Sequence, residues 1–487
     1  MTVPGELHEV QRPATRVERV MRPGSWHAAL DGLQRHPGAR PVSGGTDLML
    51  DLARSSGPPV TLIDLSAVAG AHEIDETDDT FVLAGGVIHN QIVADPRFRA
   101  HALPLAQACL EIGSPQLRNR ATIAGNLATA SPANDSISAL MVLEATVILS
   151  RLVDDSIVDR EVAVEDFFTG FRTTACASDE LITAIRVPKL GPSQRGIWVK
   201  LGLRRAQAIS VVHAGLVVEL DDEEVVTGAR LALGSVAATV VMTPIVAETL
   251  AGGPLDDARI AAAAHAVAAS IEPIDDIRAT ADYRVAATET VIARALRALA
   301  DGRAGSQWPA DPPVLGVRAA ATVPPQAEID DSAAISVTLN GVPVTGARAA
   351  GSTLLDWLRQ HSSETCPGVK EGCAEGECGA CTVQLDGAAA MSCLVPAAQA
   401  DGAEIVTVEG LAADGNLHPL QDAFVTDFAV QCGFCIPGFL VAGASLLDEC
   451  SAPTDAQISL AFSGNLCRCT GYYPMVQAVR TASDAGR

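Results

Sequence analysis

Basic side chains are scarce in this chain of 487 residues. Lysine and arginine together number 34 against 58 aspartates and glutamates, which gives a net charge of −24, and there is no long basic run. Nucleic-acid affinity comes largely from basic side chains that displace counterions, so this balance argues against nucleic acid as a partner. Hydrophobic residues nevertheless make up 48% of the chain and charged residues 19%, which excludes an acidic disordered protein.

Long apolar segments are also missing. The longest, 140–149 and 436–447, are each about a dozen residues, whereas a helix that crosses a membrane needs about 20. The amino terminus, MTVPGELHEVQRPATRVERVM, has no apolar core behind a basic start and does not predict a secretory signal. We therefore expect a cytoplasmic protein without a membrane span.

Cysteine is nearly absent from the first 365 residues, where only Cys109 and Cys176 occur, and the other ten of the 12 cysteines follow. The length alone predicts about three domains, at roughly 150 residues each. In a reducing cytoplasm, clustered cysteines are more often metal ligands or redox groups than disulfides. The distribution therefore predicts a metal-binding half after a cysteine-poor half.

A proline-rich segment separates the two halves. Residues 303–333 lose helical and strand periodicity, which predicts a semi-rigid linker. Upstream, short helices alternate with strands over 16–192, and strands precede alanine-rich helices over 193–302, which indicates an α+β domain followed by a separate lobe. Downstream, ISVTLNGVPVTG predicts a β-hairpin, and the chain becomes helical after residue 410.

The first cysteine frame has the spacing of a plant-type [2Fe–2S] ferredoxin. Four residues separate its first two cysteines, two separate the next, and eleven precede the fourth. The small Gly376 and Gly379 allow the loop to wrap a cluster closely, with backbone N–H groups directed at its sulfurs. A structural zinc site is the alternative, although zinc ribbons favour two close pairs. The predicted ligands are Cys373, Cys378, Cys381 and Cys393.

The second cysteine frame is less specific by its spacing alone. One pair encloses two residues, 31 residues follow, and a single arginine separates the last pair, so zinc and iron–sulfur both fit. The candidate ligands are Cys432, Cys435, Cys467 and Cys469. The cysteines outside both frames are expected to be small buried hydrophobic side chains; they are Cys109, Cys176, Cys366 and Cys450.

Two glycine-containing loops in the first half are candidates for an anion site. VSGGTDLM follows a predicted strand, where residues without a Cβ let backbone N–H groups converge on an oxyanion. NRATIAGNLATASPANDS supplies a second polar loop. Each alone is more often an ordinary turn or Ω-loop, but two on one α+β domain favour a binding site.

These segments together resemble the xanthine oxidase family of molybdenum hydroxylases. QCGFCIPG and NLCRCTGYYP are similar to the family's helical [2Fe–2S] domain, and the glycine loops are similar to its flavin domain, which binds FAD without a GxGxxG motif. The domain order resembles an FAD-binding medium subunit fused to a [2Fe–2S] small subunit. These two parts resemble the accessory subunits of xanthine dehydrogenase and aerobic carbon monoxide dehydrogenase. The implied α+β fold has a two-lobed FAD-binding domain, a β-grasp plant-type ferredoxin domain over 334–410 and an all-α [2Fe–2S] domain over 411–481.

The resemblance also implies cofactor contacts. The first loop should wrap the FAD diphosphate, Thr122 should hydrogen-bond the cofactor, and Asp135 should meet a hydroxyl-bearing part of it. Ile112 and Ile182 should pack near the ring system, with Lys200 at its polar edge. The full implied set is Pro41, Val42, Ser43, Gly44, Gly45, Thr46, Asp47, Leu48, Ile112, Thr122, Gly125, Asn126, Asp135, Ile182 and Lys200, and Gln431 should hydrogen-bond a pterin.

The implied function is an electron relay with no catalytic residue in this chain. Electrons would pass from a molybdopterin cofactor on a large partner subunit to the helical cluster, the ferredoxin-type cluster, FAD, and an acceptor that is NAD+, O2 or a redox protein. The segments RRAQAISVV and FFTGFR favour a purine or other N-heterocycle as substrate, and a dimer of heterodimers is the expected assembly. The open alternatives are an accessory subunit of a carbon monoxide or aldehyde dehydrogenase, a self-contained NAD(P)H-dependent flavin iron–sulfur reductase, and a zinc scaffold.

Overall fold

The computed structural model describes residues 16–54, 57–316, 327–361, 368–412 and 415–485. The chain divides into two compact units, of which unit 1 contains residues 1–71, 113–121 and 311–487 and unit 2 contains residues 72–112 and 122–310. The segment expected to form one flavin domain, 16–192, therefore contributes to both units. Its first strands belong with the iron–sulfur half of the chain.

A four-stranded sheet in unit 1 joins the amino-terminal segment to the expected linker. Its order is β15–β1–β3–β2, formed by β1 (Val17–Arg22), β2 (Arg40–Val42), β3 (Val60–Asp64) and β15 (Ala327–Asp330). β15 runs antiparallel to β1 and places Ile329, 3% exposed, opposite Val20. The prediction of a linker over 303–333 is wrong for these four residues, because burial of one isoleucine and pairing with a distant strand are not visible in local composition.

The helices of this part of unit 1 are short. They are α1 (Trp26–Arg35), α2 (Leu48–Arg54) and α6 (Pro115–Arg118). α1 begins where the Ser25 hydroxyl accepts a hydrogen bond from the Ala28 N–H, which is an ordinary N-cap. α2 begins directly after the first glycine loop, so the loop connects β2 to a helix.

The second sheet of unit 1 confirms the expected β-grasp ferredoxin fold. Its order is β17–β16–β20–β18–β19, with α13 (Leu354–His361) packed through Trp357 and three leucines. The predicted hairpin is present, and its turn residues Asn340 and Gly341 have φ of 50° and 80°. The strands are β16 (Ile335–Leu339), β17 (Val342–Gly346), β18 (Thr382–Leu385), β19 (Ala388–Met391) and β20 (Glu404–Val406).

One hydrophobic core crosses the border between the amino-terminal strands and the ferredoxin segment. Val20, Leu62 and Ile329 belong to the same cluster of buried side chains as Trp357 and Ile405. The amino-terminal sheet and the β-grasp sheet are therefore parts of one unit, although about 300 residues of sequence separate them.

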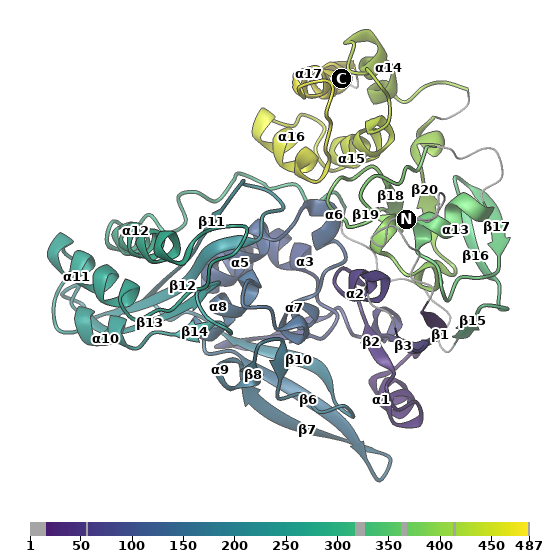
Figure 1. Cartoon of the computed structure of the whole chain (residues 1–487). Helices are drawn as coiled ribbons and strands as arrows, with labels where there is room; N and C mark the ends of the chain where they lie inside the picture. Colours follow the sequence, from purple (N-terminus) through teal and green to yellow (C-terminus); the bar gives the residue numbers. More distant parts are fainter. Residues whose placement is uncertain (1–15, 55–56, 317–326, 362–367, 413–414, 486–487) are drawn as a thin grey trace, which may run out of the picture. The chain divides into compact units, whose positions relative to one another are not determined.

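The carboxyl-terminal part of unit 1 is all helical, as expected (Figure 1). Phe439 packs edge-on against Phe462, with ring centroids 5.0 Å apart, in the core between the helices. The helices are α14 (Pro419–Thr426), α15 (Ile436–Glu449), α16 (Asp455–Ala461) and α17 (Tyr473–Ala485).

Unit 2 contains two larger sheets and one short strand pair. The five-stranded sheet, in order β4–β5–β10–β6–β7, consists of β4 (Ile74–Glu76), β5 (Thr80–Ala84), β6 (Thr146–Val153), β7 (Ser156–Ala163) and β10 (Leu181–Pro188). The four-stranded sheet, in order β11–β12–β13–β14, consists of β11 (Gln194–Gly202), β12 (Ser210–Leu220), β13 (Val226–Gly234) and β14 (Val241–Met242). The pair is β8 (Phe168–Gly170) and β9 (Thr173–Thr174).

The helices of unit 2 fall into two groups along the chain. The first group is α3 (His89–Ala94), α4 (Pro96–His101), α5 (Leu103–Glu111), α7 (Ile123–Thr129), α8 (Asp135–Val142) and α9 (Val164–Phe167). The second group is α10 (Ile245–Leu250), α11 (Asp257–Ala268) and α12 (Ala281–Ala300). The second group follows the four-stranded sheet and shares its core, which is the strand-then-helix order expected for the lobe.

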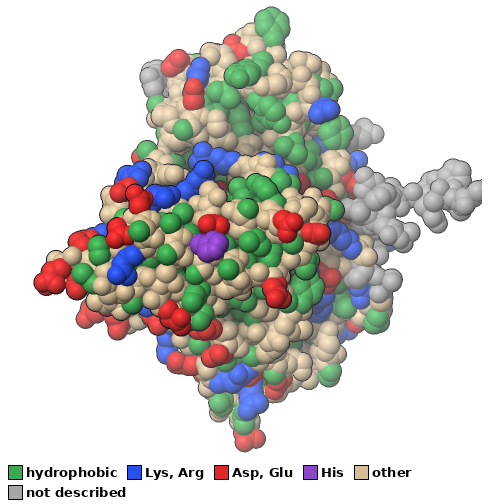
Figure 2. Space-filling view, turned by 60° about the vertical axis from the view of Figure 1, so that its left-hand side comes forward, with side chains coloured by type: hydrophobic (Ala, Val, Ile, Leu, Met, Phe, Trp, Pro, Cys, Tyr) green, Lys and Arg blue, Asp and Glu red, His purple; other side chains and the backbone are tan. Residues whose placement is uncertain are grey.

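The described surface carries charges of both signs. On the face shown in Figure 2, acidic side chains lie among basic and apolar ones. Of the helices in the described ranges, none combines the length and the apolar character that a bilayer span requires.

Candidate functional site

The ferredoxin-type frame brings its four thiols together as two pairs. Cys373 shares a hydrogen bond with Cys378, and Cys381 shares one with Cys393. Within the described ranges, no group of three or more possible ligands surrounds a single ion position. Two pairs suit a two-iron cluster, whose irons each take two of the four cysteines, and so the residues present fit [2Fe–2S].

Backbone N–H groups converge on the first ligand of this frame. The N–H groups of Glu375 and Glu377 each donate to Sγ of Cys373 at 3.3 Å. The Cys378 thiol and these N–H groups lower the pKa of Cys373, and the same contact raises the pKa of Cys378, so the pair favours one thiolate, at Cys373. The loop needs glycine at Gly376, where φ is 74° and a Cβ would lie 2.3 Å from the Leu394 side chain.

The helical frame also forms two thiol pairs. Cys432 shares a hydrogen bond with Cys469, and Cys435 shares one with Cys467. The outer pair, Cys432 and Cys469, is exposed, whereas Cys435 is buried. Burial and the Cys467 contact raise the pKa of Cys435 to about 12, and the Thr470 hydroxyl donates to Sγ of Cys467 at 3.1 Å. The pairing again fits a two-iron cluster, in which each iron takes two of the four cysteines.

The two cysteine frames are in direct contact. The Leu466 N–H, adjacent to ligand Cys467, donates to the carbonyl of ligand Cys378 at 3.0 Å. The Asn465 side chain donates to the Gly379 carbonyl at 3.2 Å and accepts from Gln116 at 2.8 Å. One hydrogen bond and a few covalent bonds therefore connect a ligand of one frame to a ligand of the other.

The first glycine loop of the predicted flavin site lies against the ferredoxin-type frame. Residues 43–47 connect β2 to α2, and Pro41, Val42 and Leu48 belong to those two elements. Gly45 has φ of 80°, and a Cβ there would lie 2.6 Å from the carbonyl oxygen of Leu394, the residue after ligand Cys393. The glycines are thus also required by close packing, a reason that sequence analysis missed.

The second glycine segment is helical. Thr122 caps α7, because its Oγ1 accepts from the Gly125 N–H at 2.9 Å. Gly125 and Asn126 lie inside α7, so the prediction that they belong to a loop is wrong. The Asn126 side chain accepts from the Ser136 hydroxyl at 2.6 Å, which joins α7 to α8.

Two of the predicted flavin contacts in unit 2 form a buried ion pair. Lys200 Nζ lies 2.6 Å from Oδ2 of Asp135, and the two side chains are 7% and 6% exposed. Asp135 also accepts from the Ser210 hydroxyl, and Lys200 donates to the Glu111 carbonyl at 3.3 Å. The structure brings together two residues that are 65 positions apart, a pairing that no local pattern predicts.

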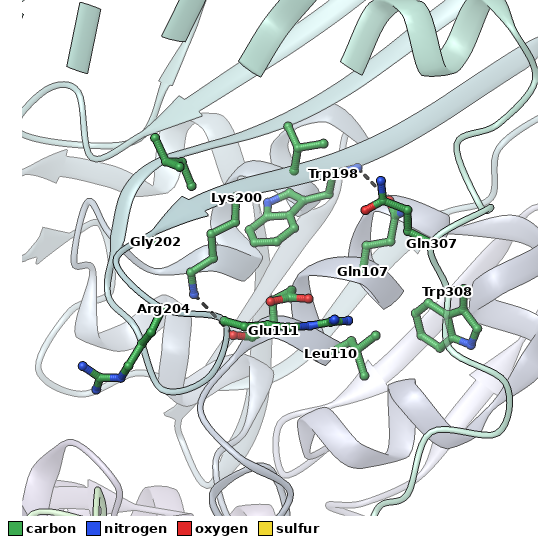
Figure 3. Close-up of a pocket in the computed structure, with 12 residues that line it drawn as sticks. Gln107, Leu110, Glu111, Trp198, Lys200, Gly202, Arg204, Gln307 and Trp308 are labelled. Carbon is green, nitrogen blue, oxygen red and sulfur yellow. Dashed lines mark hydrogen bonds between the residues drawn. The ribbon is translucent and has the colours of Figure 1, made fainter. Parts of the chain in front are cut away.

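Lys200 also lines a cavity in unit 2, with a volume of about 490 Å³ (Figure 3). Trp198 and Trp308 supply aromatic walls, and Glu111 and Arg204 supply charged ones. This volume is within the range of small-molecule sites. Of the other predicted contacts in this unit, Ile112 ends α5 and Ile182 is buried in β10.

The cysteines outside both frames differ in their surroundings. Cys109 is fully buried, as expected, with its Sγ 3.3 Å from Nδ1 of His89. Cys176 and Cys450 are only half-buried, so the expectation of complete burial is wrong for them. Burial nevertheless raises the pKa of Cys176 to about 11, which keeps it a protonated thiol. Cys366 lies outside the described residues.

Known sequence families match three parts of the chain. The FAD-binding domain in molybdopterin dehydrogenase matches residues 14–190, the carbon monoxide dehydrogenase flavoprotein C-terminal domain matches 198–299, and a [2Fe–2S]-binding domain matches 407–480. The small subunit of nicotine 6-hydroxylase from Paenarthrobacter nicotinovorans is 51% identical over 152 residues, which are 31% of this chain and 90% of that subunit. The chain belongs to the xanthine oxidase family of molybdenum hydroxylases.

Two further members of the molybdenum hydroxylase family are similar to this chain, one in sequence and one in structure. The iron–sulfur-binding subunit of xanthine dehydrogenase from Escherichia coli O157:H7 is 44% identical over 147 residues, covering 30% of this chain and 91% of that subunit. A carbon monoxide dehydrogenase structure from Hydrogenophaga pseudoflava matches with a TM-score of 0.56 and 28% identity, covering 60% of this chain and all of that chain. This molybdenum hydroxylase chain therefore carries FAD-binding and [2Fe–2S] domains, and it is an oxidoreductase subunit.

Proposed function

We propose that this chain is the electron-relay subunit of a molybdenum hydroxylase complex. When bound, the cofactors supply the chemistry: electrons from a molybdopterin on a large partner subunit would reach FAD through the helical and then the ferredoxin-type cluster. The observation that carries the proposal is the sequence of contacts within unit 1. It leads from an exposed thiol pair, through the Leu466 to Cys378 hydrogen bond, to the glycine loop packed on Leu394.

The entry side of this route is the exposed thiol pair of the helical frame. Cys432 and Cys469 are exposed beside Gln431, the predicted pterin contact. Apolar side chains near them in the sequence are exposed as well: Phe428 (84%), Phe434 (49%), Leu466 (51%) and Tyr473 (86%). Exposed aromatic residues of this kind are typical of protein interfaces, which supports docking of the large subunit here. A dimer of heterodimers is the assembly that we propose for the complex.

The exit side is the flavin. The residues proposed to bind FAD are those that the family resemblance implies: residues 41–48, Ile112, Thr122, Gly125, Asn126, Asp135, Ile182 and Lys200. The Thr122 hydroxyl accepts the Gly125 N–H and keeps its own proton for donation to a cofactor. Lys200 keeps a fixed position because Asp135 binds it, so its charge is held at one edge of the cavity.

The proposed substrate is an N-heterocycle, such as a purine. Nicotine and xanthine, after which two of the matched relatives are named, are both N-heterocycles. The proposed external acceptor is NAD+, O2 or a redox protein. The substrate pocket itself would belong to the partner subunit, so no side chain of this chain would contact the substrate.

The test is cofactor analysis of the purified chain and of two serine variants. The wild type should contain about four irons and one FAD per chain, because two [2Fe–2S] clusters and one flavin require them. Cys378→Ser should lower the iron content to about two and remove one of two EPR signals, whereas Cys450→Ser should keep four. A colourless wild-type protein that contains zinc and no iron would contradict the proposal.

A further inference from the structure

Gln399 is a buried side chain that joins the ferredoxin segment to the first glycine loop. It lies on a single turn, Ala397–Ala400, between β19 and β20, and has no solvent exposure. Its Nε2 donates to the Ser43 carbonyl at 2.9 Å and to Oδ1 of Asp64 at 2.7 Å. Its Oε1 accepts from the Arg120 guanidinium. One amide therefore contacts three segments that are far apart in the sequence.

A buried ion pair holds Gln399 in place. Arg22 donates through Nε to Oδ2 of Asp64 at 3.1 Å, and both side chains have 0% exposure. The same guanidinium donates to the Gln399 backbone carbonyl at 3.3 Å and to the Asp401 carbonyl at 3.3 Å. A buried charged pair is stable only when its remaining hydrogen-bonding positions are filled. Gln399 fills two of them, because its backbone carbonyl binds Arg22 and its side-chain amide binds Asp64.

The contact with Ser43 sets the direction of the next peptide group. A trans peptide is planar, and its C=O and N–H point in opposite directions. Because Gln399 binds the Ser43 carbonyl, the Gly44 N–H must point away from Gln399. The neighbouring backbone has little freedom to turn, since a Cβ on Gly44 would lie 2.1 Å from the Arg120 carbonyl and one on Gly45 would lie 2.6 Å from the Leu394 carbonyl.

We infer that Gln399 is a positioning residue for the flavin loop, which acts from the iron–sulfur half of the chain by orienting the Ser43–Gly44 peptide for the FAD diphosphate. The inference rests on the proposed function, in which residues 43–47 bind that diphosphate. Backbone N–H groups bind phosphate well only when they are preorganised, because each group that must reorient on binding adds a cost. FAD affinity then depends on a residue outside the flavin segment.

The test compares two substitutions of Gln399 in the full chain. Gln399→Glu keeps the shape of the side chain and the acceptor for Arg120, but it loses both donated hydrogen bonds and adds a negative charge beside Asp64. Gln399→Leu loses all three contacts. Both variants should bind FAD at least about tenfold more weakly than the wild type. Gln399→Glu should have the lower FAD affinity of the two variants, because it adds a negative charge beside Asp64. A residue that only fills space would be replaced well by the isosteric glutamate.

Gln384→Leu is the matched control, because it removes a partly buried amide of the same domain that donates to Ser445 at 3.0 Å and does not contact the loop. Iron content should stay at the wild-type value in all three variants. Hydrogen exchange of amides 43–47, measured on FAD-free protein, should be at least about tenfold faster in both Gln399 variants and unchanged in Gln384→Leu.

The two readouts separate this inference from the proposed function. Wild-type FAD affinity and wild-type exchange in Gln399→Glu would overturn the inference and leave the proposed function standing. If the wild-type protein binds no FAD and the Gln399 variants still show faster hydrogen exchange of amides 43–47, the positioning role would be supported and the flavin assignment would be overturned. Equal loss of iron and FAD in both variants would also overturn the inference, because it would show a general folding defect.

Discussion

His213 is a histidine without contact to solvent, in the middle of β12. Its Nδ1 lies 2.8 Å from the Ser138 hydroxyl, which also accepts from Trp198 Nε1 at 2.9 Å. The strand opposite must carry Gly234, because a Cβ there would lie 1.8 Å from the imidazole Nε2. Burial lowers the pKa of His213 to about 4, so the ring is neutral at ordinary pH.

This histidine predicts a loss of stability on acidification. An unfolded histidine has a pKa of about 6.5 and binds its proton first, so the contribution of His213 is complete above pH 6.5 and is lost as the pH falls towards 4. The free energy of unfolding should decrease by up to about 3 kcal/mol over this window. Urea unfolding at several pH values gives the free energy of unfolding as a function of pH. Between pH 4 and 6.5 this free energy should change less with pH in His213→Gln than in the wild type, and an equal change in both proteins would contradict the prediction.

β15 is a strand in a segment that the sequence predicted to be a linker, and it pairs with the first strand of the chain. Composition and spacing alone predicted the two cysteine frames, the Asn340–Gly341 hairpin and the helical character of the chain after residue 410, because those signals are local. The pairing of β15 with β1 and the contacts of Gln399 with Arg22, Ser43 and Asp64 join segments more than 300 residues apart, and such contacts leave no local periodicity. The same reason explains why the Lys200 to Asp135 pair was not predicted.

The contribution of β15 to unit 1 can be measured with two matched substitutions. Ile329→Ala removes a side chain that is 3% exposed from the core shared with β1, and it should lower stability by about 2–4 kcal/mol. Ile277→Ala makes the same change at a fully exposed position and should stay within about 0.5 kcal/mol of the wild type. Denaturant midpoints measure the difference, and equal midpoints for the two variants would show that β15 does not stabilise the unit.

The proposed relay predicts how the complex behaves without flavin. Mild chaotropic treatment should release FAD from the complex. The substrate should still reduce both iron–sulfur clusters through the partner subunit, and both EPR signals of the reduced clusters should therefore appear. Turnover with a soluble acceptor should fall at least about a hundredfold and return when FAD is added, because the exit from the clusters is missing. Unchanged turnover in the FAD-free complex would show that the clusters pass electrons to the acceptor directly.

The return of β15 to the first strand of the chain also affects how the enzyme tolerates dilution. Two separate subunits find each other at the concentrations of the cell, whereas segments of one polypeptide meet at an effective concentration on the order of millimolar. Because β1 and β15 belong to a single chain, the flavin segment and the iron–sulfur segment are always made in equal numbers. The relay should therefore stay assembled at protein concentrations at which a pair of free subunits would come apart.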